Sequence, residues 1–92
     1  MQIVIENISM ADEEFHQLIS GETGDALRQT AKNYLGSQGH TEKELARLKA
    51  AGGAEYEDLR RRMTAHAIEV VSLPPTDWHI RFDIAFDGGK KA

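Results

Sequence analysis

The sequence predicts a small α+β fold, in which a two-stranded sheet formed by the two ends of the chain is covered by about four helices. Three observations predict it: a strictly alternating segment near the C-terminus, a β-branched run at the N-terminus, and helical spacing of apolar residues between them. The expected order is β-α-α-α-α-β. Because a lone strand leaves its backbone groups unpaired, we expect the two terminal strands to pair with each other.

Residues 78–87 alternate between large apolar residues and polar or small ones, the pattern of a strand with one buried face. We expect this buried face to hold Trp78, Ile80, Phe82, Ile84 and Phe86. The opposite face carries His79, Arg81, Asp83, Ala85 and Asp87. Mixed charges on such a face either discourage aggregation or form a surface that contacts another protein.

The first strand is expected at residues 1–6, with Met1, Ile3 and Ile5 on one side. Ser9, three residues before Asp12, predicts a helix start close to a capping box. The helix that follows places its apolar residues on one face: Ala11, Phe15, Leu18 and Ile19. We expect the segment 20–24, with its two glycines, to end it.

Two further helices are expected before the longest one. The first spans residues 25–35 and has an apolar stripe of Leu27, Ala31, Tyr34 and Leu35. The next begins at the capping-box pair Thr41 and Glu44 and ends at the glycines 52–53. Its expected inner residues are Leu45, Leu48 and Ala51.

The longest helix is expected at residues 54–71, and the prolines 74–75 prevent its continuation. Its apolar stripe consists of Tyr56, Leu59, Met63, Ala67 and Val70. Residues 88–92 are expected to be a flexible tail. No composition shift divides the chain, so residues 1–92 are expected to form a single domain.

A two-stranded sheet is marginally stable alone, and its edges can pair with further strands. Joining edges across a twofold axis would give a four-stranded sheet. A homodimer is therefore one hypothesis for this chain.

The chain contains no cysteine, which excludes disulfides and thiolate metal sites. The chain does not begin with the basic residues and apolar run of a signal peptide, and it has no apolar stretch long enough for a membrane span. We therefore expect a cytoplasmic protein that does not associate with membranes.

No pattern in the sequence predicts catalysis, a cofactor or a metal site. Glu13 with His16, and His66 with Glu69, share helix faces, but a metal site would need further ligands. The serines do not occur in a Gly-x-Ser-x-Gly nucleophile turn. We expect the protein not to be an enzyme.

The charge distribution is uneven. Residues 1–27 carry six of the fifteen acidic residues and none of the eleven Lys and Arg residues. This asymmetry predicts a protein-interaction module whose acidic N-terminal third binds a basic surface on another protein. The expected contact residues are Asp12, Glu13, Glu14, Glu22 and Asp25. In profile the chain is similar to small proteins with which phages and mobile elements bind and block host machinery.

The alternative is a small dimeric DNA-binding regulator, since residues 41–63 are similar to a helix-turn-helix. The contact residues would be Arg60, Arg61 and Arg62, on the helix placed in the groove. Two features oppose it: Ala50 replaces the usual turn glycine, and the groove helix opens with carboxylates that would face a polyanion. The three arginines could instead form ion pairs along their own helix.

Overall fold

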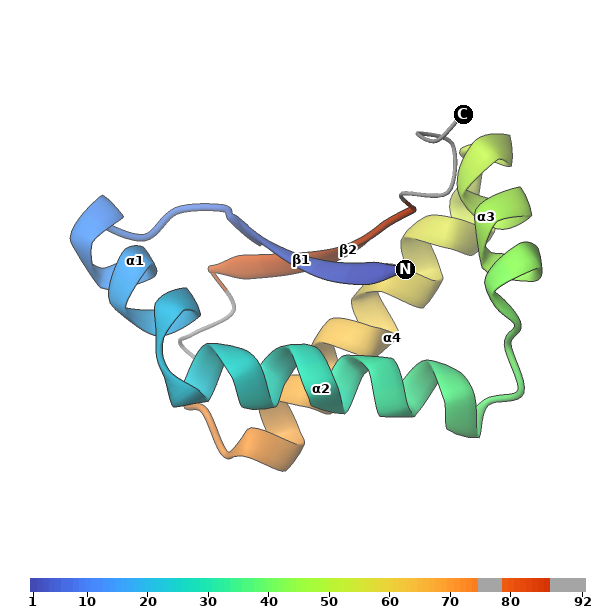
Figure 1. The fold of residues 1–92 in the computed structure, drawn as a ribbon. Helices are drawn as coiled ribbons and strands as arrows, with labels where there is room; N and C mark the ends of the chain where they lie inside the picture. The colour runs from blue at the N-terminus through green and yellow to red at the C-terminus, as the bar shows by residue number, and fades with distance from the viewer. Residues whose placement is uncertain (75–78, 87–92) are drawn as a thin grey trace.

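The computed structural model describes residues 1–74 and 79–86. Its elements in chain order are β1 (Gln2–Asn7), α1 (Asp12–Ser20), α2 (Glu22–Ser37), α3 (Glu42–Ala51), α4 (Ala54–Val71) and β2 (Ile80–Ala85). The α+β fold and the order β-α-α-α-α-β are confirmed (Figure 1). The predictions for Trp78, Asp87 and the tail 88–92 lie outside the described residues.

The sheet consists of β1 and β2, paired antiparallel with Ile3 opposite Ile84 and Ile5 opposite Phe82. The side chains of these four residues and of Ile80 are buried, as the alternating patterns predict. Phe86 is half-buried against the same core. Helices α2 and α4 cover one face of the sheet, while α1 and α3 lie at its two ends (Figure 1). The other face is open to solvent, and Val4 on it is 40% exposed.

Helix α4 has the predicted bounds but buries more of its circumference than the predicted stripe. Val70 is exposed, because it lies in the last turn, where α4 extends past α2 (Figure 1). Arg60, Thr64 and Ile68 are buried in addition to the stripe. Helix α4 packs against both α2 and β2, so it buries more than the single stripe that the sequence pattern predicts.

The expected capping box at the start of α1 is wrong. Ala11 occupies the N-cap position, and no side chain caps the helix. Ser9 Oγ instead shares a hydrogen bond with His79 Nδ1 at 3.1 Å. Asn7 holds the turn, because its Oδ1 accepts from the Met10 N–H at 2.8 Å and its Nδ2 donates to the Met10 carbonyl at 3.2 Å. The segment that leads into β2 lies beside the end of β1. Ser9 therefore bonds to His79 and does not cap α1.

Helix α2 begins at Glu22, three residues earlier than predicted, and Gly24 lies inside it. Gly24 is buried, and a Cβ at this position would lie 2.4 Å from the Ile19 carbonyl oxygen. This glycine does not break the helix. It allows the end of α1 to pack closely against α2. The break is confined to Gly21.

The residues predicted to begin and end α3 do so, and they cap it as predicted. Thr41 Oγ1 accepts a hydrogen bond from the Glu44 N–H at 3.1 Å, and Gly52 adopts the left-handed conformation (φ 63°) of a C-cap. Leu45 is buried and Leu48 half-buried. The prediction for Ala51 is wrong: it is exposed, since it lies in the last turn immediately before the glycine turn.

Candidate protein-interaction surfaces

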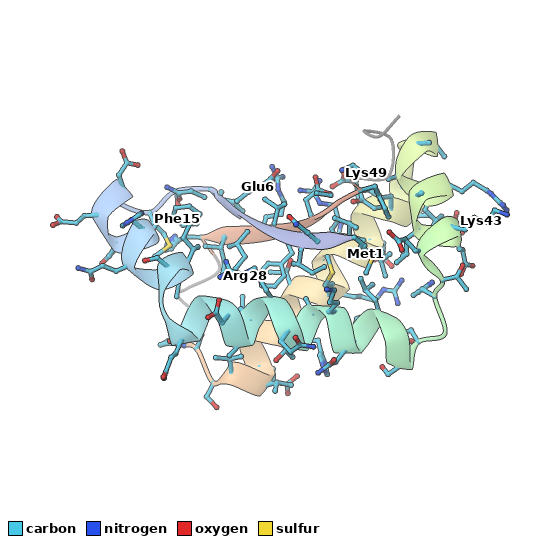
Figure 2. The ribbon with its side chains drawn as sticks, in the orientation of Figure 1. Met1, Glu6, Phe15, Arg28, Lys43 and Lys49 are labelled. Atoms are coloured by element: carbon cyan, nitrogen blue, oxygen red, sulfur yellow. The ribbon has the colours of Figure 1, made fainter. Side chains whose placement is uncertain are left out.

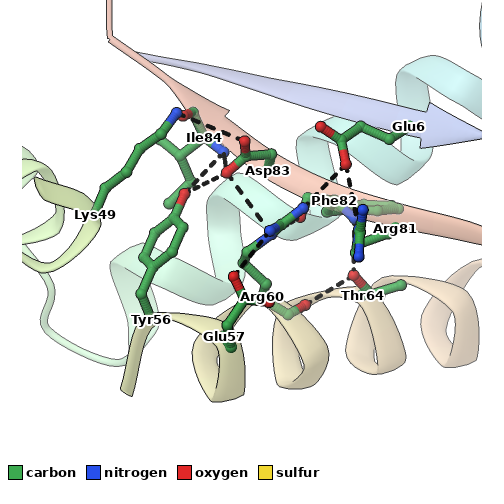
Figure 3. A network of polar contacts seen from close by, with 10 residues as sticks. All are labelled: Glu6, Lys49, Tyr56, Glu57, Arg60, Thr64, Arg81, Phe82, Asp83 and Ile84. Carbon is green, nitrogen blue, oxygen red and sulfur yellow. Dashed lines mark hydrogen bonds and ion pairs between the residues drawn. The ribbon is translucent and has the colours of Figure 1, made fainter. Parts of the chain in front are cut away.

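The outer edge of β2 is closed by side chains. In an antiparallel pair, alternate residues direct their N–H and C=O groups away from the partner strand. Phe82 is such a residue: its N–H donates to Thr64 Oγ1 at 3.1 Å, and its carbonyl accepts from Arg60 Nε at 2.8 Å. Both partners come from α4, as Figure 3 shows.

Ile84 is satisfied in the same way. Its N–H donates to the Tyr56 hydroxyl at 3.3 Å, and its carbonyl accepts from Lys49 Nζ. Side chains of α3 and α4 therefore supply the hydrogen bonds that a third strand would supply (Figure 3).

Asp83 lies at the centre of this network. Its carboxylate accepts from the Tyr56 hydroxyl and lies 3.6 Å from Lys49 Nζ and 3.7 Å from Arg60 Nε. Burial and the hydrogen bond to Asp83 raise the pKa of Tyr56 above its ordinary value. Burial also acts to raise the pKa of Asp83, but the hydrogen bonds from Tyr56 and the Ile84 N–H, with the two nearby cations, bring that pKa below its ordinary value.

Arg60 joins the network to β1. Its side chain is only 11% exposed and pairs with Glu6 at 3.0 Å and Glu57 at 3.1 Å. Glu6 also accepts from Arg81, the residue opposite it in the sheet, at 3.2 Å. No buried side-chain nitrogen or oxygen of the described residues lacks a hydrogen bond. The network is thus internally complete and connects α4 with both strands.

The three arginines of the nucleic-acid alternative do not form one surface. Arg60 is buried, whereas Arg61 and Arg62 are exposed. Both exposed arginines pair with Asp58, at 3.2 and 3.0 Å, as the i, i+3 and i, i+4 spacing allows. The basic surface of α4 is therefore smaller than the sequence predicts, and a carboxylate lies within it.

The five acidic residues expected to bind a partner fall into two groups. Asp12, Glu13 and Glu14 form the first turn of α1, whereas Glu22 and Asp25 lie in the first turn of α2. The nine-residue helix α1 separates the groups by about 13 Å along its axis. Asp25 is paired with Arg28 at 2.7 Å. Asp12, Glu13 and Glu14 are exposed, and their side chains form no hydrogen bond or ion pair within the described part of the chain.

A hollow of about 520 Å³ lies beside this first acidic group. Met10 and Leu18 contribute apolar surface to it, and Glu14 contributes a carboxylate. His79, which approaches from the beginning of the last strand segment, completes one side. The sequence pattern does not predict this hollow, because it forms between segments about 60 residues apart in the chain.

The outer edge of β1 differs from that of β2. Ile3 and Ile5 are opposite Ile84 and Phe82, so their N–H and C=O groups also point away from the partner strand. Within residues 1–74 and 79–86, no hydrogen bond to these groups is formed. The outward groups of Phe82 and Ile84 on β2 are therefore bound, whereas those of Ile3 and Ile5 on β1 are open to a further strand.

Neither histidine pair acquires metal-site geometry in the described segments. No group of three or more His, Asp or Glu side chains there is arranged to hold a metal ion. His66 instead packs its ring against Tyr34, with ring centroids 4.8 Å apart.

Among the helices of residues 1–74 and 79–86, none combines the length and apolar character needed to cross a membrane. In comparisons with protein families, curated proteins and solved structures, the chain has no significant match.

Proposed function

We propose that this chain is a non-enzymatic protein-interaction module that binds a basic surface of a partner protein through the beginning of α1. The observation that carries the proposal is the group of carboxylates of Asp12, Glu13 and Glu14, which are exposed and have no partner among the described residues. Two further features of α1 fit a peripheral role. The helix buries no residue, and it lies at one end of the molecule (Figure 1).

The adjoining hollow suits a lysine or arginine side chain. The aliphatic part of such a side chain would lie against Met10 and Leu18, and its charged group would reach Glu14. A charge-assisted hydrogen bond to a carboxylate is stronger than one between neutral groups. A basic segment thus gains both apolar contact and ion pairing at this site.

Long-range attraction adds to these contacts. The three carboxylates of Asp12, Glu13 and Glu14, which no described cation pairs with, produce a negative potential that attracts basic surfaces and repels nucleic acid. A basic surface that normally binds nucleic acid would be blocked by such a module. Small proteins of phages and mobile elements that inhibit host machinery would use the module in this way.

The test is affinity capture from a native lysate that has been treated with nuclease, with wild-type protein and a Glu13→Lys/Glu14→Lys variant. We expect the wild-type protein to retain a stoichiometric partner, and the variant to lose it. Because the attraction is between exposed charges, raising the salt concentration should also release the partner.

A matched control reverses two carboxylates elsewhere, Glu55→Lys/Glu69→Lys on α4, which are exposed and unpaired within the described segments. This variant should retain the partner. Retention by the Glu13→Lys/Glu14→Lys variant at high salt would contradict the acidic surface. Loss of all captured material on nuclease treatment would support the DNA-binding regulator instead.

A further inference from the structure

We propose that the open edge of β1 is a second binding surface, which takes an extended segment of a partner protein as an added strand and pairs a carboxylate of that segment with Lys32. The surface lies on β1 and α2 and does not involve the acidic residues of α1. It is therefore independent of the function proposed above.

The backbone of β1 supplies the first part of the argument. Ile3 and Ile5 each direct one N–H and one C=O group outward, and nothing in the described chain binds them. The equivalent groups of Phe82 and Ile84 are bound by Thr64, Arg60, Tyr56 and Lys49. Because four side chains close one edge, strand addition is directed to the other.

A groove at the beginning of this open edge supplies the second part of the argument. It has a volume of about 390 Å³ and lies between β1 and α2. Its lining residues are Gln2 and Ile3 from β1, and Asp25, Arg28, Gln29 and Lys32 from α2. Figure 2 shows Arg28 between the helix and the strand. An added strand would hydrogen-bond to β1 and place every second side chain against α2.

The charges of the groove indicate the chemistry of the segment. Arg28 is already engaged, since it donates to Asp25 at 2.7 Å and to the Ile19 carbonyl at 3.0 Å. Lys32 is exposed and forms no hydrogen bond or ion pair with any described residue. The groove therefore presents one available cation, which favours an Asp or Glu on the bound segment.

The position of α2 favours an isolated segment over a second copy of this chain. Side chains of α2 line the groove, so part of the helix lies next to the place that an added strand would take. A second copy joined edge to edge would bring its own α2 to the same place. The two α2 helices would then need about 8–10 Å between their axes at this edge, beside the paired strands. A single extended segment has no helix to accommodate.

The experiment begins with selection from a display library of random ten-residue peptides on the full chain. The strongest binder is then synthesised and titrated into ¹⁵N-labelled protein. We expect enriched peptides to contain an acidic residue, and the amide signals of Ile3, Ile5 and residues 28–32 to shift on binding. Hydrogen exchange at the Ile3 and Ile5 amides should slow, because the peptide backbone then binds them.

Two variants and two modified peptides test the details. Lys32→Glu should weaken binding about tenfold, because an attraction becomes a repulsion. Lys43→Glu, at an exposed lysine of α3 that does not line the groove (Figure 2), should leave it unchanged. N-methylation of the peptide amides that face β1 should abolish binding, whereas N-methylation of the intervening amides should not.

Three results would overturn the proposal: no peptide is enriched, the selected peptide shifts signals outside β1 and α2, or Lys32→Glu binds as well as the wild type. Protection of Ile3 and Ile5 that rises with protein concentration alone, with light scattering showing a dimer, would assign the edge to a second copy. The Glu13→Lys/Glu14→Lys variant should bind the peptide normally, which separates this test from that of the acidic surface.

Discussion

At the level of single residues, the spacing of three side chains on α4 matches the spacing of the backbone groups that they bind on β2. Tyr56, Arg60 and Thr64 are spaced by four along α4, so they form one line on the helix. Successive residues of this line rise by about 6 Å, close to the roughly 6.8 Å between alternate residues of a strand. Polar side chains at this spacing can therefore serve the outward backbone groups of β2.

Asp83 makes the stability of this network dependent on pH. Its pKa is lower in the folded protein than in the unfolded chain, so the folded state favours the carboxylate. The resulting stabilisation is present above a pH of about 4, the ordinary value for Asp, and is lost as the pH falls through the lowered folded pKa. Replacement by Asn removes this dependence.

We therefore expect the free energy of unfolding to fall more steeply below about pH 4 in the wild type than in Asp83→Asn. Urea unfolding of both proteins across the acidic range measures the difference, and the other carboxylates, common to both, cancel. Parallel curves would show that Asp83 has the same pKa in both states.

At the scale of the element, local signals set most helix ends, but the start of α2 depends on a neighbour. The Thr41 cap and the left-handed Gly52 bound α3 through interactions within a few residues. Gly24, in contrast, is required by contact with the backbone of Ile19. The sequence pattern predicts that Gly24 breaks a helix, whereas in the structure it is a point of close helix packing.

The two glycines inside α2 give a matched pair of substitutions. Gly24→Ala places a Cβ 2.4 Å from the Ile19 carbonyl oxygen, so the backbone must shift, and we expect a loss of about 2 kcal/mol or more. Gly36→Ala meets nothing within 4 Å and should stabilise the helix by about 0.5–1 kcal/mol. Thermal and urea unfolding measure both. Equal effects of the two substitutions would contradict the proposed contact.

At the scale of the whole molecule, stability is unevenly distributed. The core is formed by the sheet, α2 and α4, with one buried residue from α3, Leu45. Helix α1 contributes only partly buried side chains, among them Phe15. The proposed acidic surface thus lies on a helix that has no fully buried residue.

We expect α1 to open without unfolding of the core. Its amides should exchange hydrogen much faster than those of α2 and α4, because α1 itself has no fully buried residue. Native-state hydrogen exchange at low denaturant concentrations measures this. Exchange of α1 only at the rate of global unfolding would show that it belongs to the core's cooperative unit.

The class of fold, the order of the elements and the full extent of α4 could be predicted from the sequence, because periodicity and capping are local properties of the chain. The sequence also placed Asp12, Glu13 and Glu14 at a helix start. Three features follow from the packing of the elements instead: Arg60 is buried, the five acidic residues form two groups, and β1 has the open edge. These features depend on partners far away in sequence: Arg60 bonds to Glu6 and to the carbonyl of Phe82. Whether a charge faces solvent or a carbonyl is set by how elements pack, and a local pattern does not contain that information.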